Sequence, residues 1–66
     1  MELDKIDALV PRDHIVRVNW NAWHARLIYD DNVRAHLPRV CKKLFAPYAD
    51  EPWTARIFQR LALFSE

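Results

Sequence analysis

Few side chains in this 66-residue sequence are of the types that carry out chemistry. His24 and His36 lie in the same stretch as Arg26, and only this group could supply a general acid and a general base, for example for RNA cleavage. The hydroxyls other than those of tyrosine belong to Thr54 and Ser65, and neither has a suitable base close by in the sequence. The sequence therefore predicts that the protein is not an enzyme, and it assigns no catalytic residue.

Metal and cofactor sites are equally poorly supported. One cysteine and three histidines are too few for a typical structural zinc site, and the spacing of His36 and Cys41 matches no known zinc motif. Glycine is absent, which removes the glycine-rich loops that hold nucleotide phosphates. We therefore expect no metal and no cofactor, and we interpret Cys41 as a small apolar residue of the core.

Length and composition indicate one small folded domain over residues 1–66. The apolar fraction of 52% is too high for a disordered chain, and no apolar run approaches the roughly 20 residues that span a membrane. The acidic start of the sequence does not resemble a signal peptide, and a single cysteine cannot form an internal disulfide. We expect a soluble cytoplasmic protein with no membrane partner.

The net charge is only +1, but the charged residues are unevenly distributed. Residues 1–13 hold four acids and two bases, a net charge of −2. Residues 14–46 hold two acids and six bases, a net charge of +4, and residues 47–66 hold three acids and two bases, a net charge of −1. The middle of the chain is therefore its basic part.

Three segments have the apolar spacing of helices. The first ends at Pro11 and has its apolar positions at Leu3, Ile6, Leu9 and Val10. The last is expected to begin with Asp50 as N-cap and Pro52 in its first turn, with an apolar stripe of Trp53, Ile57, Leu61 and Phe64. Between them, the segment after Pro38 separates Val40, Cys41, Leu44 and Phe45 from Arg39, Lys42 and Lys43, as in a short amphipathic helix.

Residues 14–38 alternate between apolar and polar side chains, which is the pattern of half-buried strands. A single helix there would place Asp30 and Asp31 in its interior and would include Pro38, at a cost of roughly 3 kcal/mol. Strands avoid both problems, because residues 30–32 can form a hairpin loop and Pro38 can end an edge strand. The apolar series is Val16, Val18, Trp20, Trp23, Ala25, Leu27, Tyr29, Val33, Ala35 and Leu37.

The predicted fold is therefore α+β: a short N-terminal helix, a three-stranded antiparallel meander, and two C-terminal helices packed on one face of the sheet. An all-α helical bundle is the alternative, because some of the same apolar residues also fit a period of 3.6 residues. The residues that fit this helical period are Val16, Trp20, Trp23 and Leu27.

The meander predicts a cationic row on the polar face of the sheet. Arg17 would lie opposite Arg26 and Arg26 opposite His36, with His24 and Arg34 in the neighbouring rows. Like charges that face each other across strands are destabilising by some tenths of a kcal/mol, so an anionic partner would explain the row. The alternative is that the arginines extend into solvent or pair with the acids of the first helix.

A second candidate surface lies on the last helix. Arg56, Gln59 and Arg60 fall away from its apolar stripe and are residue types that can read base edges. Phe58 and Leu63 also lie off the stripe, so part of the apolar surface should remain exposed and favour a protein partner or self-association. The candidate binding residues are Arg17, His24, Arg26, Arg34, His36, Arg56, Phe58 and Arg60.

These surfaces favour a non-enzymatic regulatory or inhibitory protein that binds a protein or nucleoprotein partner and forms a homo-oligomer. Compact chains of this kind are common on mobile elements such as phages. The alternative is a nucleic-acid-binding protein that uses the basic sheet face or the last helix, although a net charge of +1 is low for such a protein.

Overall fold

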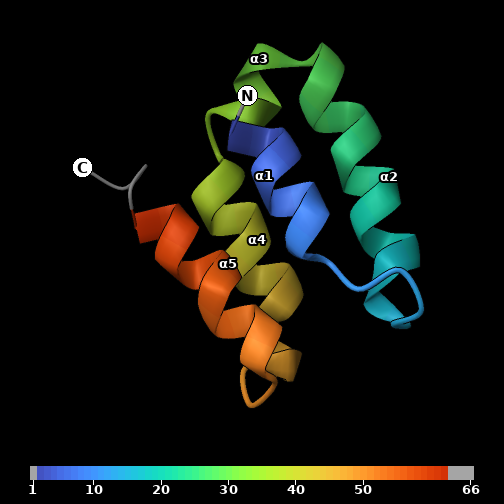
Figure 1. The fold of residues 1–66 in the computed structure, drawn as a ribbon. Helices are drawn as coiled ribbons and strands as arrows, with labels where there is room; N and C mark the ends of the chain where they lie inside the picture. Colours follow the sequence, from blue (N-terminus) through green and yellow to red (C-terminus); the bar gives the residue numbers. More distant parts are fainter. Residues whose placement is uncertain (1, 63–66) are drawn as a thin grey trace.

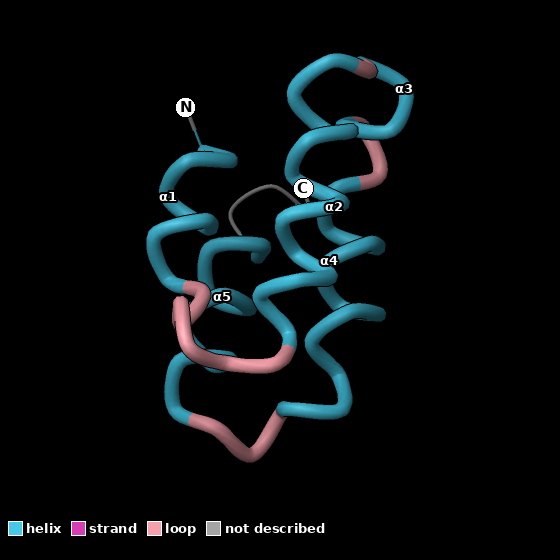
Figure 2. Tube along the Cα trace, turned by 90° about the vertical axis from the view of Figure 1, so that its right-hand side faces the viewer, coloured by secondary structure: helices cyan, strands magenta, loops and turns pink. Residues whose placement is uncertain are grey.

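The structure, a computed structural model, describes residues 2–62, and this part of the chain is helical (Figure 1). The order is α1 (Glu2–Leu9), α2 (Val16–Tyr29), α3 (Asp31–Arg34), α4 (Leu37–Phe45), a 3-10 helix (Ala46–Tyr48) and α5 (Pro52–Ala62). No strand occurs within residues 2–62, as the colouring in Figure 2 shows. The predicted α+β fold with its meander is therefore wrong, and the all-α alternative fits.

The helices at the two ends of the chain follow the predicted apolar spacing. In α1, Leu3 and Ile6 are buried, and Val10 is buried just after the helix. In α5, Ile57 and Leu61 are buried, while Trp53 is half-buried against the core. The helix begins at Pro52, so the expected N-cap Asp50 lies one residue too early, and the predicted position of Phe64 lies outside the described residues. Both helices are confirmed.

The strand prediction for residues 14–38 is wrong for a specific reason, which lies at Asp30. Its extended backbone ends α2, and its carboxylate Oδ1 accepts hydrogen bonds from the backbone N–H groups of Asn32 (3.0 Å) and Val33 (3.3 Å), which caps α3. Pro38 lies in the first turn of α4, where a missing N–H is tolerated. The chain therefore avoids both obstacles to a continuous helix by forming three helices.

The apparent alternation came from two apolar faces on one helix. Val16, Trp20 and Leu27 of α2 are fully buried, as the helical period requires. Val18 and Tyr29, which the alternation also counted as inward-facing, are 74% and 88% exposed. Because apolar residues occupy both faces of α2, the sequence showed a pattern close to that of a strand.

The helices enclose one hydrophobic core. α1 and α4 each pack against both α2 and α5, and α3 connects α2 to α4. Figure 1 shows α2 along one edge of the molecule and α5 along the other. The rings of Trp20 and Phe45 lie 5.8 Å apart in the core, and Trp53 meets Phe45 edge-on at 5.7 Å. No helix within residues 2–62 is long and apolar enough to cross a membrane.

Candidate functional site

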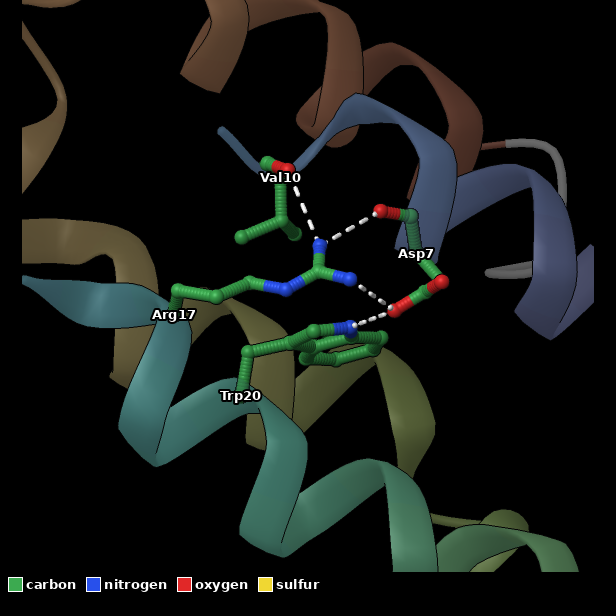
Figure 3. A network of polar contacts seen from close by, with 4 residues as sticks. All are labelled: Asp7, Val10, Arg17 and Trp20. Atoms are coloured by element: carbon green, nitrogen blue, oxygen red, sulfur yellow. Dashed lines mark hydrogen bonds and ion pairs between the residues drawn. The ribbon is translucent and has the colours of Figure 1, made fainter. Parts of the chain in front are cut away.

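Arg17 forms a bridge between α1 and α2 (Figure 3). Its Nη1 donates hydrogen bonds to the backbone carbonyls of Asp7 (3.1 Å) and Val10 (2.9 Å), and its Nη2 lies 3.3 Å from Asp7 Oδ1. Trp20 Nε1 donates to the same carboxylate oxygen at 2.7 Å. The Asp7 carbonyl also accepts the Val10 N–H (3.2 Å), so Arg17 adds a second hydrogen bond there and binds the Val10 carbonyl just after α1. Arg17 thus pairs with an acid of the first helix, as the alternative interpretation expected.

The expected cationic row does not form, because residues 2–62 contain no sheet and its members lie on α2, on α3 and in the turn before α4. Arg26 is exposed, and its Cζ lies 5.6 Å from the centroid of the Trp23 ring, which is a cation–π contact. Arg34 pairs with Asp31 within α3. His36 is exposed in the turn before α4.

His24 is half-buried on α2 beside Trp20, with the two ring centroids 5.7 Å apart. Its Nε2 is buried and has no hydrogen-bond partner among the described residues. His24 and His36 were expected as diagonal neighbours on a sheet, and that arrangement is absent because both lie in the helical part of the chain. The acid–base pair that depended on the sheet therefore has no geometric basis.

The exposed side of α4 carries the main concentration of unpaired positive charge. We call His36, Arg39, Lys42 and Lys43 the α4 basic surface; with Ala35 and Pro38 they line an open cavity of about 640 Å³. Arg39, Lys42 and Lys43 are exposed, and none of them has an ion-pair partner among the described residues. The opposite side of α4 is buried through Leu37, Cys41 and Phe45, which holds these cations outward.

A groove between α2 and α4 adjoins the α4 basic surface. It has a volume of about 410 Å³, and its lining, which we call the α2–α4 groove, consists of Trp23, Arg39, Val40, Lys43 and Leu44. The three apolar members are half-buried, and two of them, Trp23 and Leu44, pack against the core and so form a fixed floor. Arg39 and Lys43 belong to both the groove and the basic surface. The result is an apolar floor with positive charge along the α4 side.

The predicted residues of the last helix lie on a different surface. Arg56, Gln59 and Arg60 are exposed on α5 and, with Leu9, line a cavity of about 560 Å³. Phe58 is half-buried and packs against the core, so only part of its ring is available to a partner. Leu63 lies outside the described residues. The arginines of α5 therefore form a second basic cavity without an apolar floor of comparable size.

The remaining side chains with reactive groups are buried and contribute to the core. The Thr54 hydroxyl is fully buried and donates a hydrogen bond to the Tyr48 carbonyl at 2.6 Å. Cys41 is buried, as predicted, and desolvation raises the pKa of its thiol to about 12, so the thiol is protonated at neutral pH. Within residues 2–62, no group of three or more potential ligands is placed to hold a metal ion.

His14 has a structural role that the sequence did not reveal. Its Nδ1 accepts a hydrogen bond from the Val16 N–H (3.1 Å), its Nε2 lies 2.7 Å from Glu51 Oε2, and its ring meets Tyr48 and Trp53 edge-on. Because Nδ1 is an acceptor, the proton of the neutral ring lies on Nε2, next to the carboxylate. The contact joins the start of α2 to the turn before α5.

Sequence reasoning recognised the cations of α4 as the polar side of a helix but did not select them as binding residues. A usable signal was present, because residues 32–49 contain four Arg and Lys residues and no acid. Salt bridges within α4 were therefore impossible, and its cations could be neutralised only by acids from other elements or from a partner. Trp23, Val40 and Leu44 could not be assigned to one groove without knowing that α2 is a helix and packs beside α4.

No protein-family model, curated protein or solved structure matches this chain.

Proposed function

We propose that this chain is a non-catalytic binding protein that regulates or inhibits a protein or nucleoprotein target by holding an acidic, partly apolar segment of that target in the α2–α4 groove. The proposal depends chiefly on one observation: Arg39 and Lys43 flank an apolar floor and have no ion-pair partner among the described residues. The single cysteine of the chain, Cys41, is a buried free thiol, which suits a reducing compartment. We therefore propose that the protein is located in the cytoplasm.

The floor of the groove supports an apolar contribution to binding. Trp23, Val40 and Leu44 are only half-buried, so a partner side chain placed on them would remove further apolar surface from water. Partly exposed tryptophans at the centre of a groove are frequent hot spots of protein interfaces. Arg26 Cζ lies 5.6 Å from the centroid of the Trp23 ring, so a cation also borders the apolar floor on the α2 side.

The charges support an acidic partner. Four cationic side chains lie in or beside the groove, and α4 itself contains no acid. Complementary charge accelerates association and selects the partner, whereas a basic segment would be repelled. A short amphipathic helix with acids beside its apolar side chains has the required chemistry, since helices commonly bind in apolar grooves of this kind. The cations are Arg26, Arg39, Lys42 and Lys43.

Fluorescence anisotropy tests the proposal with a labelled amphipathic peptide that carries leucines at helical spacing and glutamates between them. The double variant Arg39→Glu/Lys43→Glu should weaken binding by at least about tenfold, or 1.4 kcal/mol, because it reverses both charges beside the floor. The matched control is Arg56→Glu/Arg60→Glu, which makes the same charge change on α5 and should leave the affinity within about twofold. The same peptide with lysines in place of glutamates should not bind.

Equal weakening by both double variants would overturn the proposal, since it would show that only net charge matters. Binding of the lysine peptide, or no binding of the glutamate peptide to the wild-type chain, would overturn it as well. Circular dichroism of both variants shows that the helices are retained before the affinities are compared.

Binding of nucleic acid through α5 is the second candidate. The observation in its favour is the cavity lined by Arg56, Gln59 and Arg60, whose side chains can contact phosphates and base edges. Titration of a labelled DNA duplex and a single-stranded RNA at several salt concentrations separates the two candidates. A steep fall of affinity with salt that is lost in Arg56→Glu/Arg60→Glu would favour nucleic acid.

A further inference from the structure

α2 presents a second apolar stripe on the side opposite its buried face. It begins at Ile15, the residue before the helix, and its spacing alternates between three and four residues. Ile15, Val18 and Tyr29 are 77%, 74% and 88% exposed, and both alanines of the stripe are exposed. The outer α2 stripe, as we call it, consists of Ile15, Val18, Ala22, Ala25 and Tyr29.

This stripe is unusual for an exposed surface of so small a protein. None of its five members is charged, and Ile28, 41% exposed, extends it on one side. Tyr29 contributes most of an aromatic side chain of roughly 150–250 Å², and with the exposed parts of Ile15, Val18 and Ile28 the total is on the order of 500 Å². The largest apolar patch on a typical monomer is roughly 300–600 Å², and a patch of this size is often functional. Its size therefore makes the stripe a candidate contact surface.

We propose that the outer α2 stripe is the contact surface of a symmetric homodimer, in which α2 packs antiparallel against α2 of a second copy. Three- and four-residue spacing along a helix is the pattern by which two helices pack side by side in a coiled coil. Two such stripes would bury roughly 1,000 Å² in total, which is the area at which specific interfaces begin. The area and the spacing together fit a second copy of the same helix.

The distribution of side-chain size also fits self-association. Ala22 and Ala25 lie in the middle of the stripe, and the larger side chains lie at its two ends. In a two-fold symmetric contact, small side chains near the axis let the two backbones approach closely, and the larger ones close the interface at both ends. In the antiparallel arrangement, the Ile15 end of one copy lies against the Tyr29 end of its partner.

The antiparallel orientation follows from charge. Arg26 borders the stripe beside Ala22 and Tyr29, which lie four residues before it and three after it, and its Cζ lies 5.6 Å from the centroid of the Trp23 ring. A parallel pair would bring the two copies of Arg26 together and would align the two helix dipoles, whereas an antiparallel pair separates the charges and opposes the dipoles. The α2–α4 groove is not part of this contact, because its α2 member, Trp23, is not in the stripe. The dimer therefore does not depend on the function proposed above.

Sedimentation equilibrium across micromolar to submillimolar concentrations tests the dimer with a matched pair of variants. Ala25→Glu and Ala55→Glu make the same change at exposed alanines, one in the stripe and one on α5. The wild-type chain should have twice its 7.9 kDa monomer mass, Ala55→Glu should remain a dimer, and Ala25→Glu should raise the dissociation constant at least about 30-fold, because it buries a charge. Val18→Ser, an uncharged change in the stripe, should weaken the dimer in the same direction.

Several outcomes would overturn the proposal: a wild-type monomer at all concentrations, dimers that tolerate both Ala25→Glu and Val18→Ser, or equal dissociation by Ala25→Glu and Ala55→Glu. A nitroxide attached through Tyr29→Cys tests the orientation, since Cys41 is buried and unreactive. Antiparallel packing should separate the two labels by about 20 Å, from the 1.5 Å rise per residue. Labels within about 10 Å of each other would instead show a parallel pair.

Discussion

The helices α2 and α4 pack side by side and contribute to the same core, but their exposed sides have opposite chemistry. α4 faces solvent with Arg39, Lys42 and Lys43, whereas α2 faces it largely with the apolar side chains of the outer α2 stripe. Charge on the exposed side leaves the helical period of α4 easy to read. Apolar residues on both sides of α2 hide the same period.

The difference shows where sequence patterns fail and why. A pattern predicts a helix only if the exposed side is polar, and a protein that uses its exposed side for binding can violate that condition. The misreading of α2 is thus a consequence of the same exposed apolar residues that we propose as the dimer contact. In α4, the exposed cations leave the fold unambiguous and point to a partner of opposite charge.

The largest expected effect separates the two faces of α2. Trp20 is fully buried and hydrogen-bonded to Asp7, so Trp20→Ala should lower the free energy of unfolding by about 3–5 kcal/mol. Val18→Ala, on the exposed face, should change it by less than about 0.5 kcal/mol at concentrations low enough for the monomer. Urea denaturation measures both values. Similar losses for the two variants would contradict the assignment of inner and outer faces.

The burial of Cys41 on the inner face of α4 can be tested by measuring how the free energy of unfolding depends on pH. Burial raises the pKa of the Cys41 thiol from its ordinary value of 9.0 to about 12 in the folded chain, so the unfolded chain loses this proton first. Stability from Cys41 is therefore fully present below pH 9 and falls by about 1.4 kcal/mol per pH unit between pH 9 and about 12. The difference in unfolding free energy between wild type and Cys41→Ala should show this slope. A difference independent of pH would contradict the burial of the thiol.

Two arginines of α2 allow a hydrogen-bonded side chain to be compared with an exposed one. Arg17 donates to two carbonyls at the end of α1 and contacts the Asp7 carboxylate, so Arg17→Met should destabilise the fold by about 2 kcal/mol. Arg26 contacts only the Trp23 ring from an exposed position, and Arg26→Met should cost less than about 0.5 kcal/mol. Thermal and urea unfolding measure the difference. Equal costs would show that the bridge between α1 and α2 contributes little.

Much of the fold could be predicted where one side of a helix is apolar. Leu3 and Ile6 in α1, Cys41 in α4 and Ile57 in α5 are buried as their spacing indicated. The binding surfaces were harder, because they depend on which helices are neighbours. The cations of α4 were recognised in the sequence, but their position beside Trp23 follows from the packing of α2 against α4, which no local pattern contains.

The smallest effect concerns Asp30, the residue at which the predicted hairpin was wrong. Its carboxylate accepts the Asn32 and Val33 N–H groups and so starts α3. Three-residue hairpin loops commonly include one residue in the left-handed conformation, and none of the described residues has positive φ. Asp30→Ala removes the cap and should destabilise the fold by about 1 kcal/mol, with faster amide exchange at Asn32 and Val33.

Asp31→Ala is the matched control, because Asp31 is a carboxylate of the same turn that pairs with Arg34 at an exposed site and caps nothing. Its cost should be a few tenths of a kcal/mol. If the two alanine variants lost equal stability, or if exchange at Asn32 and Val33 did not change in Asp30→Ala, the break between α2 and α3 would have another cause than this cap.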